Sequence, residues 1–153
     1  MKAVIQRVSE ASVEVEGNII GEIENGFLVL LGVAEGDTEA DADILAKKTA
    51  MLRIFEDENG KMNKALTDLD YDCLVISQFT LLADTKKGNR PSFIHAAGPD
   101  KAIPLYERYI KQLKENGIKR VEHGAFGADM KVRLLNDGPV TICYDSDQWI
   151  RKD

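Results

Sequence analysis

The chain has 153 residues, of which 44% are hydrophobic and 30% charged, as in an ordinary globular protein. A chain of this length can bury one core of its own, so we expect a single domain over residues 1–153. The net charge of −6 argues against a nonspecific nucleic-acid coat, which needs a broad basic face, and no DNA partner is expected.

A membrane or secreted location is not indicated either. No stretch approaches the roughly 18 uninterrupted apolar residues of a membrane span. Residues 1–8 alternate like a strand and lack the apolar core and cleavage site of a signal peptide. We therefore expect a cytoplasmic protein with no membrane partner.

The first third of the chain has the alternating pattern of half-buried strands. Apolar and polar residues alternate over residues 2–8 and again over 12–16. Gly17 and Asn18 come next, and because both accept positive φ at little cost, we predict a hairpin turn there. The continuous apolar run over residues 27–33 predicts a strand buried on both faces.

Two helices are predicted from their end signals. The first begins at Thr38, a good N-cap, with Asp41 three positions later as in a capping box. The second begins near Pro99, which suits the first turn of a helix, and ends at Gly117, which is placed to cap it. Residues 84–98 lie between them and form the least regular stretch of the chain.

The remaining strands complete the predicted fold. They are expected over residues 73–79, 118–122, 131–135 and 140–144. Strands separated by two main helices predict an α/β fold with a mixed sheet. We expect a three-layer arrangement of two β layers and one helical layer.

Metal and redox chemistry are not indicated by the cysteines or histidines. Cys73 and Cys143 are the only cysteines, and their separation matches no metal or redox spacing, so we expect buried reduced thiols. His95 and His123 are too few and too scattered for a metal centre. We predict no metal ion and no cofactor.

The first candidate site is the end of the strand predicted over residues 73–79, where the sequence reads Ser77-Gln78-Phe79-Thr80. Backbone N–H groups without ladder partners at such a strand end can point at a developing oxyanion. Gln78 offers a side-chain amide and Thr80 a hydroxyl. A Thr nucleophile needs an activating base, and none stands beside it in the sequence. Spacing alone also fits a purely structural strand end.

The second candidate is the dipeptide Gly138-Pro139, which precedes the strand over 140–144. It fits an ordinary turn into an edge strand. In a functional role, glycine would allow close approach of the backbone and proline would fix the direction of two carbonyl groups. The isomer of the peptide bond stays open at this point.

Basic residues gather in the irregular stretch. The candidates for binding one end of an RNA are Lys86, Lys87 and Arg90. Further candidates are Lys119-Arg120 and Lys131 with Arg133. Solvated surface charge is the alternative interpretation.

On these residues the chain resembles the D-aminoacyl-tRNA deacylases, the D-tyrosyl-tRNA deacylase family of bacteria and eukaryotes. The resemblance extends over essentially the whole chain, with no departure at the central positions. The matching segments are KAVIQRV at 2–8, SQFTL at 77–81, KGNRPSF at 87–93, GAFGADM at 124–130 and NDGPVTI at 136–142.

The resemblance implies a homodimer that hydrolyses the ester between a D-amino acid and the 3′-terminal adenosine of tRNA, a proofreading step of translation. By resemblance, Gly138-Pro139 is a cis dipeptide that reaches into the partner subunit's pocket beside Ser77–Thr80. Its carbonyl groups meet the α-amino group of the substrate and leave no room for an L side chain. The family also accepts glycine attached to tRNA.

Further site residues follow from the same resemblance. Arg7 matches the position that steadies the dipeptide across the interface. Phe126 and Met130 match positions near the site, and Ala102 is assigned to the pocket that holds the adenine.

The chemistry expected of these residues needs no strong nucleophile, because an aminoacyl ester is already activated. We expect backbone N–H groups around Gln78 and Phe79 to hold the ester carbonyl while the 2′-hydroxyl of the tRNA assists an attacking water. Two alternatives remain: an esterase with Thr80 as nucleophile, and a catalytically silent dimeric RNA-binding module.

Overall fold

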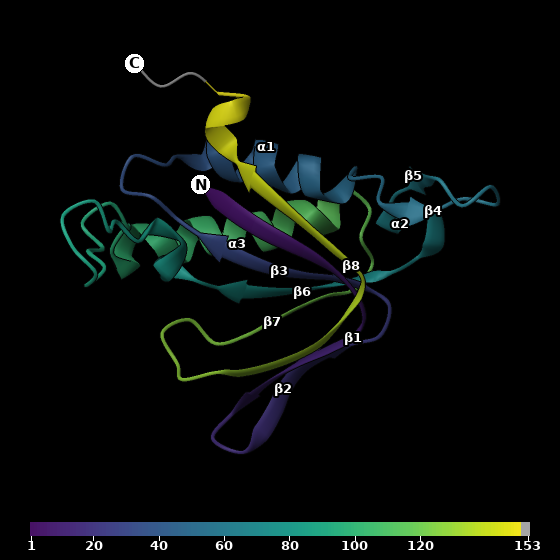
Figure 1. Ribbon diagram of the computed structural model, residues 1–153, viewed down its shortest axis with the longest axis horizontal. Coiled ribbons are helices and arrows are strands. Elements are labelled where there is room, and N and C mark those ends of the chain that lie inside the picture. The colour runs from purple at the N-terminus through teal and green to yellow at the C-terminus, as the bar shows by residue number, and fades with distance from the viewer. Residues whose placement is uncertain (151–153) are drawn as a thin grey trace.

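The computed structural model describes residues 1–150, which form a curved sheet covered on one side by helices (Figure 1). The strands are β1 (Lys2–Val15), β2 (Asn18–Ile23), β3 (Gly26–Gly32), β4 (Phe55–Glu56), β5 (Met62–Lys64), β6 (Asp72–Ser77), β7 (Val121–His123) and β8 (Lys131–Asp145). The helices are α1 (Glu39–Ala50), α2 (Leu66–Leu69) and α3 (Pro99–Glu115), with short 3₁₀ turns at Phe79–Leu82 and Ser146–Gln148.

The long strand β1 organises the sheet. Its first half pairs antiparallel with β3, its second half with β2, and its other edge with β8. Parallel pairing of β3 with β6 and of β6 with β7 continues the sheet, which is therefore mixed, as predicted.

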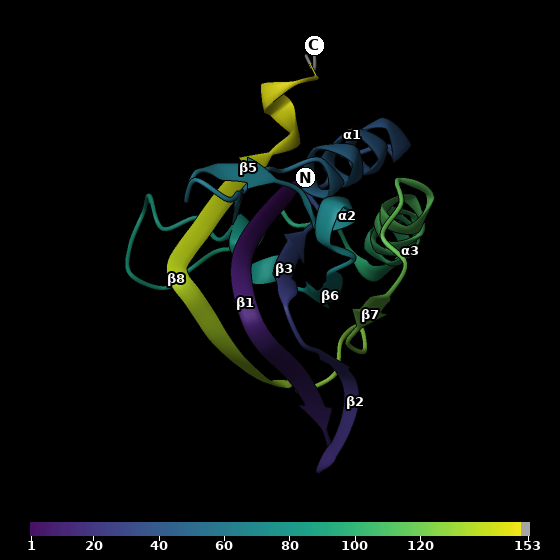
Figure 2. The ribbon, with the colours of Figure 1, turned by 90° about the vertical axis from the view of Figure 1, so that its right-hand side faces the viewer.

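Curvature of β1 produces two β layers (Figure 2). Its second half carries β2 beneath β6 and β7, which β2 contacts. The two layers come close at Gly21, where an added Cβ would lie 3.0 Å from the carbonyl oxygen of His123 and 3.1 Å from the side chain of Leu74. Glycine at this position lets the two layers approach.

Two hydrophobic cores separate the three layers. Residues alternate along β6, so that Cys73 and Val75 face the helices while Leu74 and Ile76 face the second β layer. This explains why the segment is apolar throughout. The predicted arrangement of two β layers and one helical layer is confirmed.

The helix ends follow the predicted signals. The backbone N–H of Thr38 donates to Asp41 Oδ2 at 2.9 Å at the start of α1, and Pro99 occupies the first turn of α3. Gly117 has φ +104°, as a residue past a helix end often does. The two helices are joined by a buried hydrogen bond of 2.9 Å from the Tyr109 hydroxyl to Thr49 Oγ1.

Several details differ from the sequence prediction. The strands predicted over 73–79 and 118–122 are β6 (Asp72–Ser77) and β7 (Val121–His123). The hairpin turn lies at Glu16-Gly17, both with positive φ, because Asn18 already pairs with Val15. Cys143 is exposed in this chain rather than buried. The two strands predicted over 131–135 and 140–144 are one strand, β8, interrupted by a bulge.

The bulge in β8 contains the glycine–proline dipeptide. Gln6 pairs with Thr141 and Val8 with Asn136, so residues 137–140 stand opposite the single residue Arg7. Sequence periodicity ends at the bulge, although pairing with β1 resumes beyond it.

No helix within residues 1–150 is long and apolar enough to cross a membrane.

Candidate active site

A pocket of about 270 Å³ opens where β3 and β6 end. We call it the strand-end pocket. The carboxyl ends of parallel strands meet at one edge of a sheet, which is why Ser77 of β6 and Leu31 of β3 lie together there. The lining residues are Leu31, Val33, Ile76, Ser77, Gln78, Phe79, Ala97, Ala102, Tyr106, Phe126, Gly127, Ala128, Met130 and Val132.

Six of the predicted site residues line this pocket: Ser77, Gln78, Phe79, Ala102, Phe126 and Met130. They come from β6, from the turn after it, from α3 and from the segment between β7 and β8. The structure therefore brings together segments that lie about fifty positions apart in the sequence.

The backbone amides at the strand end are not equivalent. The N–H of Gln78 donates to the Leu31 carbonyl at 2.8 Å and extends the ladder between β6 and β3. The expectation that Gln78 supplies an oxyanion donor from its backbone is therefore wrong. Phe79 and Thr80 begin a 3₁₀ turn, where the first amides have no acceptor within the turn. The first amide with such a partner is that of Leu81, which donates to the Gln78 carbonyl at 3.2 Å.

Thr80 does not line the strand-end pocket, and its hydroxyl accepts a hydrogen bond from the side-chain amide of Gln78. No carboxylate, histidine or lysine is among the lining residues, all of which belong to the described part of the chain. A proton acceptor that could activate a Thr nucleophile is thus missing from the pocket wall.

Tyr106 is the one titratable side chain in the lining, and it was not among the site residues expected from the sequence. Its hydroxyl donates to the Val75 carbonyl at 2.9 Å. Burial raises the pKa of the Tyr106 phenol, so the group stays neutral. Its spacing could have indicated that it lines the pocket, because Tyr106 lies one helical turn after Ala102 and faces the same side of the helix.

The Gly138-Pro139 bulge lies outside the strand-end pocket of its own chain. The peptide bond is cis, and both residues are exposed. Arg7 Nε donates to the Asp137 carbonyl at 2.9 Å, and Arg7 Nη1 donates to the Ile54 carbonyl at 2.7 Å. Asn136 Oδ1 accepts the N–H of Val140 at 3.0 Å. Arg7 thus holds the bulge within the same chain.

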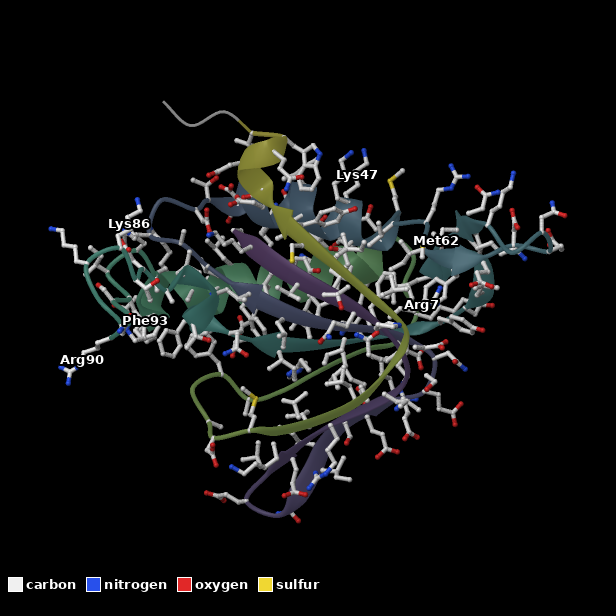
Figure 3. The ribbon with its side chains drawn as sticks, in the orientation of Figure 1. Arg7, Lys47, Met62, Lys86, Arg90 and Phe93 are labelled. Atoms are coloured by element: carbon white, nitrogen blue, oxygen red, sulfur yellow. The ribbon has the colours of Figure 1, made fainter. Side chains whose placement is uncertain are left out.

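Figure 3 places Arg7 well away from Phe93, whose ring packs against that of Phe79 with centroids 5.0 Å apart. The bulge and the strand-end pocket therefore occupy different ends of the molecule. One chain by itself does not bring the two candidate segments into one site.

The basic residues Lys86, Lys87 and Arg90 lie on an exposed loop, and Figure 3 shows Lys86 and Arg90 at the same end of the molecule as Phe93. Asp84 and Ser92 close this loop with two backbone hydrogen bonds of 2.8 Å. The Lys86 amide donates to the Asp84 carboxylate at 2.9 Å, and this bond, with help from His95 at 3.3 Å, lowers the pKa of Asp84. Phe93 links the loop to the pocket through Phe79.

Residues 1–150 contain no cluster of three or more histidine, cysteine, aspartate or glutamate side chains arranged to hold a metal ion. Cys73 is buried, and burial raises the pKa of its thiol. The strand-end pocket thus offers backbone donors, hydroxyl and amide groups, and apolar walls.

Known proteins resemble this chain over nearly its full length. Residues 4–145 match the family described as D-Tyr-tRNA(Tyr) deacylase. Proteins named D-aminoacyl-tRNA deacylase are 56% identical in Flavobacterium johnsoniae, covering 95% of this chain and 97% of the relative, and 58% identical in Roseiflexus castenholzii, covering 95% and 92%.

Two solved structures share the fold. One is titled c-Myc DNA Unwinding Element Binding Protein, with a TM-score of 0.89, 42% identity and coverage of 95% of this chain and 98% of that one. The other is titled as a probable eukaryotic D-amino acid tRNA deacylase, with a TM-score of 0.80, 16% identity and coverage of 94% and 97%. From its sequence matches, the chain belongs to the D-Tyr-tRNA(Tyr) deacylase family, whose members are hydrolases.

Proposed function

We propose that this protein hydrolyses the ester bond of D-aminoacyl-tRNA and releases the free D-amino acid and tRNA. It acts as one domain in the cytoplasm and accepts glycyl-tRNA as well, because selection works by excluding L side chains. The observation that carries the proposal is the pair of amides at Phe79 and Thr80, which begin a turn next to a pocket whose lining has no carboxylate, histidine or lysine. Relatives named D-aminoacyl-tRNA deacylase support the choice of substrate.

The pocket chemistry suits an activated ester. The Phe79 amide, with Thr80 beside it, donates to the ester carbonyl as negative charge develops there; one such donor contributes about 3–4 kcal/mol to transition-state stabilisation. The 2′-hydroxyl of the terminal ribose assists the attacking water. The adenine lies against Ala102, Phe126 and Met130, on the apolar side of the pocket.

Thr80 has a positioning role in this mechanism. Its hydroxyl accepts a hydrogen bond from the side-chain amide of Gln78 and so fixes the orientation of that amide at the strand end. We expect Thr80→Ala and Thr80→Val to keep measurable turnover. Near-complete loss in both variants, with normal folding and tRNA binding, would instead support an acyl-enzyme on Thr80. Replacing the terminal 2′-hydroxyl of the tRNA by hydrogen should abolish turnover.

The chiral filter is completed by a second copy of the chain. The exposed Gly138-Pro139 bulge is held by Arg7 and lies outside the strand-end pocket of its own chain. In a two-fold dimer the bulge of each subunit enters the strand-end pocket of its partner. Its carbonyl groups meet the α-amino group of the substrate, and packed backbone stands where an L side chain would go.

Lys86, Lys87 and Arg90 contact the tRNA backbone near the pocket mouth. Their exposure on a loop joined to Phe79 through Phe93 supports this role. Phosphate contacts of this kind weaken with salt. Replacing all three residues by Gln should raise KM for tRNA and flatten its salt dependence.

The first experiment is incubation with D-tyrosyl-tRNA and L-tyrosyl-tRNA. Release of D-tyrosine alone is expected. A silent RNA-binding module would release neither amino acid, and a Thr80 esterase would cleave small activated esters without RNA. Either result would overturn the proposed function.

A mixing experiment tests the shared site. Phe79→Pro damages the pocket and Gly138→Ala damages the donated bulge. When the two impaired proteins are mixed in equal amounts and exchange subunits, half of the dimers are mixed and each of these has one site that is intact in both parts, so activity should rise to about one quarter of wild type. If each bulge served its own chain, no mixed dimer would contain an intact site and activity would stay at the level of the two variants.

A further inference from the structure

A second hollow lies beside the strand-end pocket and has no part in the function proposed above. It has a volume of about 570 Å³ and is formed by α3, by β7 with the residues that follow it, and by Ile20 of β2. We call it the side groove. Its apolar surface comes chiefly from Ile20, Ile103, Ile110 and Phe126.

The groove is bordered by one face of α3. Ile103, Glu107, Ile110 and Lys114 recur at helical spacing, so they line up along the helix. Lys111 and Lys114 are exposed at its edge, and Lys111 also lies 3.8 Å from Glu115. An exposed pair of this kind is weak and leaves the lysine able to meet an anion. Glu107 also lines the groove, so the two lysines exceed its acidic lining residues by one.

The groove borders on the strand-end pocket. Tyr106 and Phe126 line both hollows, and their rings pack edge to face with centroids 6.1 Å apart. The two hollows are therefore neighbours that meet at these two side chains. His123 lies on the far wall, with its Nδ1 2.7 Å from the Gly124 carbonyl oxygen, which orients an exposed imidazole.

We propose that the side groove binds the nucleotide that precedes the terminal adenosine of the aminoacylated tRNA. This inference rests on the proposed function, which places that adenosine in the strand-end pocket. The base stacks between the apolar floor and the rings of Phe126 and His123, and the phosphate meets Lys111 and Lys114. Unpaired bases of RNA are commonly held in this way, by stacking on aromatic or histidine rings with a cation near the backbone.

The test compares two small substrates: D-tyrosyl-adenosine and the dinucleotide D-tyrosyl-cytidylyl-adenosine. Stacking of one base and one phosphate contact should raise kcat/KM for the dinucleotide about tenfold or more over the nucleoside. In Lys111→Gln/Lys114→Gln and in His123→Ala this ratio should fall toward one. All three side chains are exposed, so the variants should fold, which circular dichroism checks.

Lys47→Gln/Lys61→Gln is the matched control, because it removes the same charge from exposed positions outside both hollows. It should keep the wild-type ratio. Equal kcat/KM for the two substrates in the wild-type protein would overturn the side-groove assignment, as would variants with an unchanged ratio. Failure of the proposed function is distinguishable, since the wild-type protein would then leave D-tyrosyl-tRNA intact.

Discussion

The strand-end pocket and the Gly138-Pro139 bulge have opposite shapes. The pocket is a hollow with walls from β3, β6, α3 and the segment before β8. The bulge projects from the sheet, is exposed, and is held in place by Arg7 and Asn136. In the proposed function each supplies what the other lacks: the pocket supplies the N–H groups of Phe79 and Thr80, and the bulge supplies carbonyl groups. The comparison teaches that, on this proposal, one chain carries both halves of a site and leaves them unassembled.

Removing the donor amide should have the largest effect. Phe79→Pro deletes the N–H at the first position of the 3₁₀ turn, a place where proline fits the backbone. Loss of one oxyanion donor costs about 10²–10³ in kcat. Phe79→Ala is the matched control, because it removes the same ring and keeps the amide. Single-turnover kinetics on D-tyrosyl-tRNA should separate the two, and equal rates would remove the Phe79 amide from the mechanism.

Altering the bulge should come next. Gly138 has φ +142°, and an added Cβ would lie 2.7 Å from Val140 Cγ2 and 3.2 Å from Arg7 Nη2. Because an L side chain rarely adopts this conformation, Gly138→Ala should displace the carbonyl groups and reduce deacylation at least about tenfold. Gly36→Ala is the control, since nothing lies within 4 Å and its φ is ordinary. A Gly138→Ala protein with normal rate and normal chirality would refute the role of the bulge.

Loosening the support of the bulge should act on stability as well. Arg7 is 8% exposed and makes two hydrogen bonds to carbonyl groups. Lysine lacks the fork that reaches both, so Arg7→Lys should lower the free energy of unfolding by about 1.5–3 kcal/mol, as measured in urea. Arg133→Lys, at an exposed ion pair with Glu14, should change it little. Similar values for both would mean that Arg7 does not brace the bulge.

The smallest expected effect is a change in the mobility of the loop that carries Lys86, Lys87 and Arg90. The Lys86 amide lowers the pKa of Asp84 from its ordinary value of 3.8. The stabilisation of the loop by the Asp84 carboxylate is therefore fully present at pH values above 3.8. That contribution is lost as the pH falls through the lowered pKa. The backbone amide of Gly88 should therefore become more mobile in NMR relaxation at low pH than at pH near 5. In Asp84→Asn, the mobility should not depend on pH over this range; an unchanged wild-type loop at low pH would contradict the assignment.

Local signals in the sequence predicted most of the secondary structure. Thr38 with Asp41 and Pro99 with Gly117 act within a few residues of their own positions, so both helices begin, and the second one ends, as expected. The apolar run of β6 predicted burial on both faces, and therefore two cores. The turn at Glu16-Gly17 was displaced by one residue because pairing with the neighbouring strand, rather than residue type, sets the register.

The candidate site was predictable only in part. Ser77, Gln78 and Phe79 were found from a change of composition at a strand end, and Gly138 from its neighbour proline. Tyr106 was missed, because helical spacing shows only that a residue faces the core.

The sequence by itself determined the layers, the helix ends and the family, since each depends on periodicity, capping or motifs that are local to the chain. Only the tertiary structure decided which amides at the strand end are available. The Leu31 carbonyl occupies the Gln78 amide, and that partner comes from a strand more than forty positions away. It also decided that the bulge and the pocket lie apart, because the pairing of β8 with β1 carries residues 137–140 past Arg7 and away from the end of β6.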